Sequence, residues 1–393
     1  MQTRLGSTLR SINRARTICT ILARFGFGQF VQGLRLEGTP ILGRMLVSKE
    51  MAELSVHERV RRAIEELGPT FIKLGQIAST RPDLLPSSWI DELKKLQSDI
   101  PAVGFDEIKP VLEREFPGGI ETVFESIEEE AFAAASMAQI HRAVLVGGER
   151  VVVKILRPGI RGVIDGDIEI LSLIAEFAQH NLKNLGYSPV DVVRQFATEL
   201  RLETDLAREA RSAQRMAGDL AELEGVSIPR VFPKASTRNI LTMEEIKGTL
   251  LSHVEVDELS EETRLAVARH CADAVFTQCL SVGFFHADPH PGNIFLTEDD
   301  GICLIDFGMT GHIDPGTAAA LAGLIQGVVT SDLERVIRIA VSLTDADPSL
   351  ARQRQFRADV WAFLTNFRVQ SLSEIAIGPM LSEFFATLRA HNL

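Results

Sequence analysis

Residues 284–311, which read FFHADPHPGNIFLTEDDGICLIDFGMTG, constrain this chain more than any other stretch. Asp288, Asn293 and Asp306 stand in or beside segments as apolar as NIFL and ICLID. A carboxylate that is buried without a partner is costly, so such acids need a cation, a set of hydrogen-bond donors or a chemical role. Oxygen-bearing side chains of this kind suit a hard cation such as Mg²⁺, which shares phosphate oxygens. The stretch therefore predicts a polar loop beside two short buried strands.

The spacing of these polar residues is more informative than their types. His286, Asp288 and Asn293 form an H-x-D-x-x-x-x-N pattern, and Asp306 opens a D-F-G triplet thirteen residues after Asn293. This order and spacing match the catalytic set of kinases. The match predicts that Asn293 and Asp306 hold Mg²⁺. Asp288 would position an attacking hydroxyl or water, and His286 would brace the loop. The alternative interpretation is a set of satisfied loop acids that cap turns.

A phosphoryl-transfer site also needs a cation on a buried strand, and Lys154 in RVVVKIL fits this requirement. A lysine flanked by valines must have an anionic partner, either phosphate or carboxylate. The segment ELRLETDLAREARSAQRM, read as part of one helix over 190–223, offers Glu203, Asp205 and Glu209 as partners. On such a helix Glu203 and Glu209 point about 120° apart, so two separate partners are expected.

Kinases usually carry a GxGxxG loop, and this chain has AAASMAQ, Ala133–Gln139, at the corresponding strand and turn. Alanines restrict the close approach of backbone N–H groups to phosphate that glycines allow, so Ser136 and Gln139 would supply side-chain donors instead. Met243 and Glu244 close an apolar strand whose backbone would meet adenine. The expected nucleotide-binding residues are Ala133, Ala134, Ala135, Ser136, Gln139, Lys154, Met243 and Glu244.

The remaining sequence patterns give the expected domain organisation. Apolar residues recur with a helical period over 56–77, and Gly68-Pro69 predicts one helix ending near Leu67 and a second beginning at Pro69. The stretch around Gly147-Gly148 predicts a hairpin with RVVVKIL as its second strand, and residues 160–183 predict a long helix. The fold class is therefore α+β with two lobes, in which a ligand would be expected in a cleft. The expected parts are a basic amphipathic segment (1–50), a helical extension (51–122), a mixed lobe with two inserted long helices (123–246) and a helical lobe (247–393).

Four separated motifs make the chain resemble the UbiB/AarF family of atypical protein-kinase-like proteins, a group tied to ubiquinone biosynthesis. They are KLGQ at 73–76, AAASMAQIHRA from 133, ETDLAREA at 203–210, and HADPHPGN with LIDFGMTG. The resemblance runs from about residue 20 to about residue 390. It implies a kinase-like fold whose N-terminal extension folds over the active site, with ATP or ADP and Mg²⁺ as cofactors.

The resemblance also implies how the charged residues are sorted. The KxGQ helix would lie across the nucleotide site, and its Lys73 and Gln76 side chains would point into that site. Glu203 and Asp205 would be their partners. Glu209 would then pair with Lys154. Lys73, Gln76, Glu203 and Asp205 would regulate the site, because the KxGQ helix would occupy the place where a peptide substrate docks.

Two features depart from the family pattern. Ala138 stands where relatives have glycine, and its methyl group would crowd the turn or the phosphates. The chain also stops at LRAHNL, where relatives continue with a further helical segment, so we expect it to be shortened at its C-terminus.

Charge and composition limit the partners. The formal net charge of −12 argues against a general nucleic-acid binder, and the four cysteines show no disulfide framework or metal spacing. No stretch reads as a membrane-spanning helix.

Before Glu37 the chain has six arginines and no acid. This segment predicts a helix lying on an anionic membrane surface, an organelle transit peptide, or a helix packed on the body of the protein. The chain is thus expected in the cytoplasm or at the inner membrane, mitochondrial in a eukaryote.

Three functions follow from these observations. The first is an atypical kinase or ATPase that hydrolyses ATP or phosphorylates a small lipid-like molecule or protein partner, in support of ubiquinone or other isoprenoid-lipid biosynthesis. The second is a nucleotide-sensing pseudokinase that scaffolds a membrane-associated biosynthetic complex, and Ala138 favours it. The third is a small-molecule phosphotransferase of the aminoglycoside or choline type, against which KLGQ and the alanine-rich loop argue.

Overall fold

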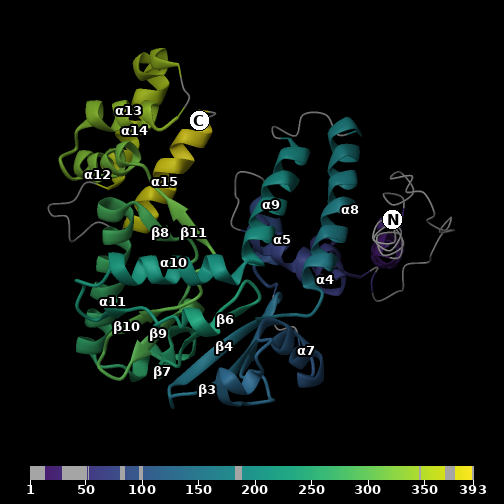
Figure 1. Cartoon of the computed structure of the whole chain (residues 1–393). Coiled ribbons are helices and arrows are strands. Elements are labelled where there is room, and N and C mark those ends of the chain that lie inside the picture. Colours follow the sequence, from purple (N-terminus) through teal and green to yellow (C-terminus); the bar gives the residue numbers. More distant parts are fainter. Residues whose placement is uncertain are drawn as a thin grey trace. The chain divides into compact units, whose positions relative to one another are not determined.

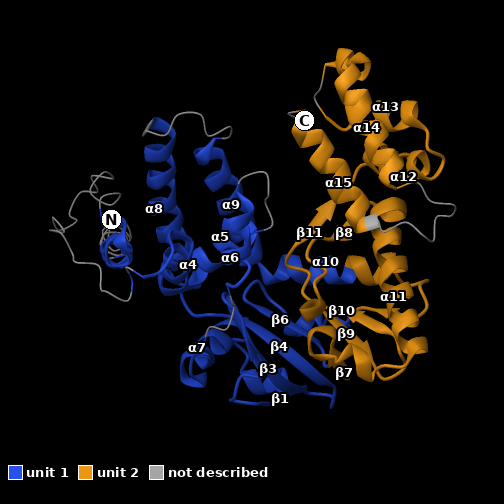
Figure 2. Cartoon of the chain, turned by 180° about the vertical axis from the view of Figure 1, so that it is seen from behind, with its two compact units in different colours: residues 1–214, 229–245 blue, residues 215–228, 246–393 orange. Residues whose placement is uncertain are grey.

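The fold was analysed in a computed structural model, which describes residues 14–28, 51, 53–79, 85–96, 101–181, 188–344, 347–367 and 377–391. The chain forms two compact units (Figure 2). Unit 1 contains residues 1–214 and 229–245, and unit 2 contains residues 215–228 and 246–393. Each unit is described by itself.

The helical part of unit 1 begins with residues 14–28, which end in the π-helix η1 (Ala23–Phe27) and bury Ile18, Cys19 and Phe25. The Arg14 guanidinium binds the fully buried Asp167 carboxylate, with 2.6 Å from Nε to Oδ1. These contacts show that residues 14–28 pack on the body of unit 1. The rest of the expected basic segment, 1–13 and 29–50, lies outside the described residues. Among the helices that the structure describes, none has an apolar run long enough to span a bilayer.

Two helices follow, and their junction confirms the prediction from Gly68-Pro69. Helix α4 (Val56–Leu67) starts at a capping box in which Ser55 and Glu58 satisfy each other's backbone N–H groups. It ends at Leu67, because Gly68 takes a φ of 95° that other residues rarely adopt, and α5 begins at Pro69. The remaining helices of this part are α5 (Pro69–Ser79), α6 (Ser87–Leu93) and α7 (Phe105–Glu115).

The sheet of unit 1 is antiparallel with the strand order β1-β3-β4-β6, and β2 pairs with β3. The predicted Gly147-Gly148 hairpin is confirmed, since it joins β3 to β4. Fully buried Val151, Val153 and Ile155 of β4 belong to one apolar cluster with residues of α7, so Lys154 points to the opposite face of the strand. The strands are β1 (Phe124–Ile127), β2 (Ala133–Ala134), β3 (Ala138–Leu145), β4 (Arg150–Leu156) and β6 (Ile240–Glu244).

Three long helices interrupt this sheet between β4 and β6 (Figure 1). They are α8 (Ile160–Asn181), α9 (Pro189–Glu203) and α10 (Leu206–Asp219), and α10 crosses from unit 1 into unit 2. The prediction of one helix over 190–223 is wrong, because the chain breaks at Thr204-Asp205. The Asp205 carboxylate accepts a hydrogen bond from the Arg208 N–H and thereby caps α10. Glu203 and Glu209 therefore lie on different helices, and the angle deduced for a single helix does not apply.

Unit 2 contains a four-stranded sheet with the order β5-β10-β9-β7 and a two-stranded sheet of β8 and β11. The predicted strands NIFL and ICLID are confirmed as β9 and β10. An apolar cluster that includes fully buried Phe356 and Met380 holds the C-terminal helices together. The elements are β5 (Val226–Ser227), β7 (Gly248–Leu250), α11 (Glu261–Phe276), η6 (Thr277–Val282), β8 (Phe284–His286), β9 (Ile294–Thr297), β10 (Ile302–Leu304), β11 (Thr310–His312), α12 (Pro315–Val329), α13 (Leu333–Ser342), α14 (Arg354–Asn366) and α15 (Ile377–Ala390).

Candidate functional site

The structure pairs Lys154 with Glu209, as the resemblance implied. Lys154 Nζ lies 2.8 Å from Oε1 and 3.0 Å from Oε2 of Glu209, so the ammonium group contacts both carboxylate oxygens. The Glu209 side chain is 3% exposed and that of Lys154 is 14% exposed. A buried ion pair of this geometry fixes the position of the ammonium group on β4.

The KxGQ motif contributes a second ion pair within unit 1. Lys73 Nζ on α5 lies 2.9 Å from Glu203 Oε1 at the end of α9, and both side chains are mostly buried. Gln76 lies on the same helix, and its side-chain amide donates to the Leu96 carbonyl at 3.5 Å. Asp205 does not join this group, because its carboxylate caps α10 and lies 3.3 Å from Arg238 Nε.

The alanine-rich loop forms a tight turn at the start of β3. The Ala135 N–H donates to the Ala138 carbonyl at 2.8 Å. Ser136 is 6% exposed, whereas Ala133 and Ala135 are exposed. Ala138 itself is buried opposite Leu156. Its φ is not among the positive values found in the described chain, so this turn does not require glycine at position 138.

Gln139 does not have the role that the sequence suggested. Its side chain is fully buried and clamps the backbone of Val103, whose N–H donates to Oε1 at 3.0 Å and whose carbonyl accepts from Nε2 at 3.1 Å. Nε2 also lies 2.9 Å from Nε2 of His141. The prediction of a phosphate donor is therefore wrong, because these groups already use the amide. The alternation of side chains along β3 could have predicted this burial, because Gln139 points to the same buried face of the strand as Ala143 and Leu145.

Met243 and Glu244 are strand residues with engaged backbones. They lie opposite Val152 and Val151 of β4, and the Glu244 N–H donates to the Arg230 carbonyl at 2.9 Å. The Met243 side chain is 6% exposed. Since the Glu244 N–H is used in this way, a backbone contact with adenine would have to come from other groups of this segment.

His286 braces the catalytic loop of unit 2. Its Nδ1 accepts from the Asp288 N–H at 3.1 Å, so Nε2 carries the ring proton and donates to the Ile305 carbonyl at 3.0 Å. The ring is 5% exposed and packs on fully buried Phe307, with ring centroids 5.4 Å apart. The histidine thus ties the loop to the strand that precedes the D-F-G triplet.

Antiparallel pairing brings the two expected metal ligands to one end of a hairpin. Ile294 of β9 lies opposite Leu304 of β10, and the Ile305 N–H donates to the Asn293 carbonyl at 2.9 Å. The Asn293 amide nitrogen donates to the Asp288 carbonyl at 3.0 Å, which leaves the amide oxygen as the group that can bind a cation. Asp306 holds a left-handed φ of 59°, and the Gly308 N–H donates to its Oδ1 at 3.2 Å. Neutral and anionic oxygens of this kind fit Mg²⁺.

The carboxylates of this loop are more exposed than the sequence suggested. The Asp288 side chain is 46% exposed, Asp306 is exposed, and only Asn293 is buried. The reasoning from buried acids is therefore wrong, because apolar neighbours in the sequence do not determine which way a loop carboxylate points. Among the described residues, no three His, Cys, Asp or Glu side chains gather as a metal-binding group. Any Mg²⁺ here would take further oxygens from a ligand or water.

Sequence reasoning missed a cavity of about 500 Å³ beside the catalytic loop in unit 2. Its wall includes His286, Leu304 and the thiols of Cys271 and Cys279. Burial raises the pKa of both thiols, so they stay protonated at neutral pH. No local pattern predicts this cavity, because its walls come from α11, η6, β8 and β10.

Comparison with known proteins identifies the family. Residues 95–340 match the ABC1 atypical kinase-like domain. The chain is 37% identical over 313 residues to the protein named Activity of bc1 complex kinase 7, chloroplastic, from Arabidopsis thaliana, covering 79% of this chain and 45% of that protein. It is 32% identical over 346 residues to a probable protein kinase UbiB from Marinobacter nauticus, covering 87% of this chain and 63% of that protein.

One further protein and one solved structure are similar to the chain. An uncharacterised protein from Synechocystis is 32% identical over 378 residues, covering 93% of this chain and 92% of that protein. The erythromycin complex of Rv3197 from Mycobacterium tuberculosis has a similar fold, with a TM-score of 0.56 and 20% identity over 83% of this chain and 89% of that one. The chain therefore belongs to the family of ABC1 atypical kinase-like domains, whose members include relatives named as UbiB kinases.

Proposed function

We propose that this chain is an ATP-dependent atypical kinase or ATPase of the UbiB type. It would bind ATP or ADP with Mg²⁺ and transfer the terminal phosphoryl group to water, a small lipid-like molecule or a protein partner. The observation that carries the proposal is the buried contact of Lys154 with both carboxylate oxygens of Glu209. Apolar residues of similar volume would often be as stable as this buried ion pair, so a role in orienting phosphate would account for the presence of both charges.

Each group would have a distinct role. Lys154, oriented by Glu209, would neutralise phosphate charge. Asn293 and Asp306 would bind Mg²⁺ through oxygen atoms, and Mg²⁺ would supply charge stabilisation at the phosphates. Asp288, half exposed and held by the His286 ring, would orient the attacking oxygen.

Phosphate contacts at the alanine-rich loop would come from backbone N–H groups other than that of Ala135, which already donates to the Ala138 carbonyl. Ala133, Ala134 and Ala135 lie before the turn, and Ser136 follows them. Gln139 has no part in these contacts because it binds Val103. Binding of the nucleotide phosphates would therefore depend more on Lys154 and Mg²⁺ than it does in kinases with a glycine-rich loop.

By the family resemblance, the KxGQ helix would occupy the place where a peptide substrate docks, so an ordinary peptide substrate is not expected. Its Lys73 is held by Glu203, so we propose that Lys73, Gln76 and Glu203 regulate the reaction, whereas Asp205 supports the start of α10. Relatives named UbiB point to ubiquinone or another isoprenoid lipid as the biosynthetic context. A partner at an anionic membrane surface would suit that context.

Nucleotide binding and hydrolysis by the purified chain test the proposal. Fluorescent ADP should bind in the presence of Mg²⁺, and ATP hydrolysis should exceed background and rise with anionic liposomes. Saturable binding with hydrolysis at background would instead favour a nucleotide-sensing pseudokinase. A folded protein that neither binds nor hydrolyses nucleotide would refute both.

The chain offers a matched control for the metal site. Asp306→Asn removes the charge but keeps a side chain that tolerates left-handed φ, so the fold should persist while Mg²⁺-dependent binding is lost. Asp300 is also exposed, lies in the turn between β9 and β10, and has a φ of 60°. Asp300→Asn should leave nucleotide binding unchanged.

A further inference from the structure

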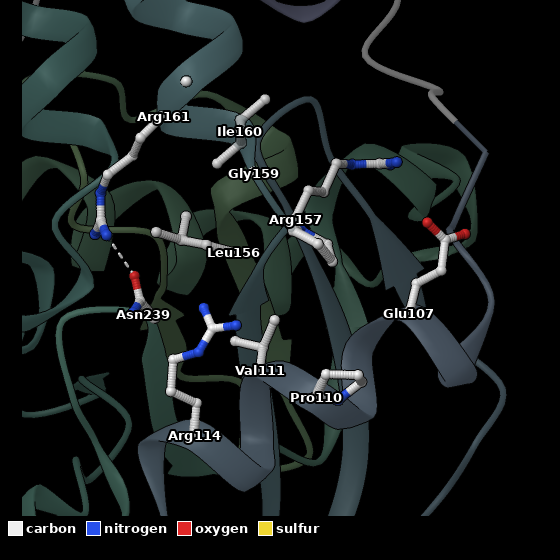
Figure 3. A pocket seen from close by; sticks show the side chains of 12 residues that line it. Glu107, Pro110, Val111, Arg114, Leu156, Arg157, Gly159, Ile160, Arg161 and Asn239 are labelled. Carbon is white, nitrogen blue, oxygen red and sulfur yellow. Dashed lines mark hydrogen bonds between the residues drawn. The ribbon is translucent and has the colours of Figure 1, made fainter. Parts of the chain in front are cut away.

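A second pocket lies in unit 1, where none of the kinase motifs predicts a site. It has a volume of about 440 Å³ and is bordered by α7, the turn from β4 into α8, and Asn239 before β6 (Figure 3). Helix α7 covers the face of β4 to which Val151 and Val153 point, and Lys154 points to the opposite face. The pocket therefore lies on the opposite face of β4 from Lys154, and its wall adjoins the alanine-rich loop through Arg157.

Three guanidinium groups line this pocket, and one carboxylate, that of Glu107, lines it with them. Arg114 is an exposed residue of α7 whose side chain makes no ion pair or hydrogen bond with the described residues. Figure 3 shows Arg114 and Arg161 on the side of Asn239, and Arg157 directed toward the other side. The Arg157 guanidinium donates to the carbonyls of Ala135 and Pro101. We therefore focus on Arg114 and Arg161.

Arg161 is partly buried without a contacting counter-ion among the described residues. Its Nη1 donates to Asn239 Oδ1 at 2.6 Å, and its Nη2 donates to the Thr204 carbonyl at 2.6 Å, which are both neutral acceptors. Its Nε is buried without a hydrogen-bond partner. Burial, followed by the nearby Arg238, lowers the pKa of Arg161, and the more distant Asp205 and Glu115 carboxylates oppose this shift without contacting the guanidinium group. An anion in the pocket would add a negative charge closer to Arg161.

The surrounding structure favours the same kind of ligand. Asn239 Nδ2 donates to the Glu115 carboxylate at 2.5 Å, so this nearby acid already has a donor. The 22-residue helix α8 begins in the pocket wall and has no acid in its first turn, and the positive end of a helix favours anions. Val111 and Leu156 add apolar surface beside the charges.

We propose that this pocket binds a phosphate-type oxyanion, held by Arg114 and Arg161, with an attached apolar group against Val111 and Leu156. The shared chemistry is that of a phosphate monoester, whether as a free metabolite or as the headgroup of a lipid. Arg114 can bind such an oxyanion through paired hydrogen bonds, for which lysine is a poor substitute. Arg161, whose two Nη groups already donate to Asn239 and Thr204, would contribute its positive charge.

The test measures binding of inorganic pyrophosphate and of short-chain phosphatidic acid to the full chain by calorimetry. Arg114→Ala should weaken both by about tenfold, which is the loss of roughly one charge-assisted contact. Since Arg114 is exposed, the variant should fold normally. Lys109→Ala, an exposed residue of the same helix that does not line the pocket, should bind as the parent does. Glu107→Gln should bind more tightly.

A Lys154→Met variant separates this pocket from the nucleotide site. Pyrophosphate binding that survives Lys154→Met and weakens in Arg114→Ala supports the proposal, whether or not the chain binds nucleotide. Binding that Lys154→Met abolishes and Arg114→Ala leaves intact would overturn it, as would no saturable binding at all. Tighter binding of phosphatidic acid than of pyrophosphate would identify a lipid source, and the reverse order would identify a free phosphate.

Discussion

The pair of Lys154 and Glu209 allows a quantitative prediction. Lys154→Met removes the cation and leaves the Glu209 carboxylate, 3% exposed, without its lysine partner. Removal of one member of a buried pair typically costs about 3–5 kcal/mol, and the 14% exposure of Lys154 places this case near about 3 kcal/mol. The double variant Lys154→Met, Glu209→Leu removes both charges and should regain most of that loss, because apolar replacements of a buried pair are often neutral.

Urea unfolding of the four proteins of this cycle, followed by circular dichroism, gives the coupling energy. We expect a coupling of about 2 kcal/mol or more, since both carboxylate oxygens contact the ammonium group. Glu203→Gln is a useful control because Glu203 pairs with a different lysine and should not alter the coupling. A coupling below about 0.5 kcal/mol, within the error of additive sites, would refute the reasoning.

Three further predictions concern unit 1. Gln139→Leu should lower the free energy of unfolding by about 1–3 kcal/mol, because the Val103 N–H and carbonyl would lose their partners, and urea unfolding checks this. Arg14→Ala should leave the fully buried Asp167 carboxylate uncompensated, so amide exchange within residues 14–28 should rise markedly when measured by mass spectrometry. Hydrogen bonding from Arg150 lowers the pKa of Glu245, so that this stabilisation is present above the unfolded pKa of about 4.3 and is lost as the pH falls through the lower folded pKa. Glu245→Gln should therefore flatten the acid limb of the stability profile, and an unchanged limb would contradict the assignment.

The sequence by itself determined the local features and the family. Gly68-Pro69 fixed the end of α4 and the start of α5, because these residues restrict the backbone within a few positions of themselves. The Gly147-Gly148 turn and the alternation around it gave the β3–β4 hairpin in the same way. The order of the motifs was enough to indicate a kinase-like family, since such spacing rarely arises by chance in unrelated chains.

The pairs Lys154–Glu209 and Lys73–Glu203 were implied by the resemblance, and only the tertiary structure decided which other side chains meet. Because the helix breaks at Thr204-Asp205, the Asp205 carboxylate pairs with Arg238. Packing between distant segments places the Gln139 amide against the backbone of Val103. The side chains of Arg114, Arg161 and Asn239, distant in sequence, line one pocket because α7 packs on the sheet beside the start of α8. Burial and charge pairing depend on contacts between distant segments, whereas turns and caps depend on neighbouring residues, so a sequence pattern predicts the second kind of feature far better than the first.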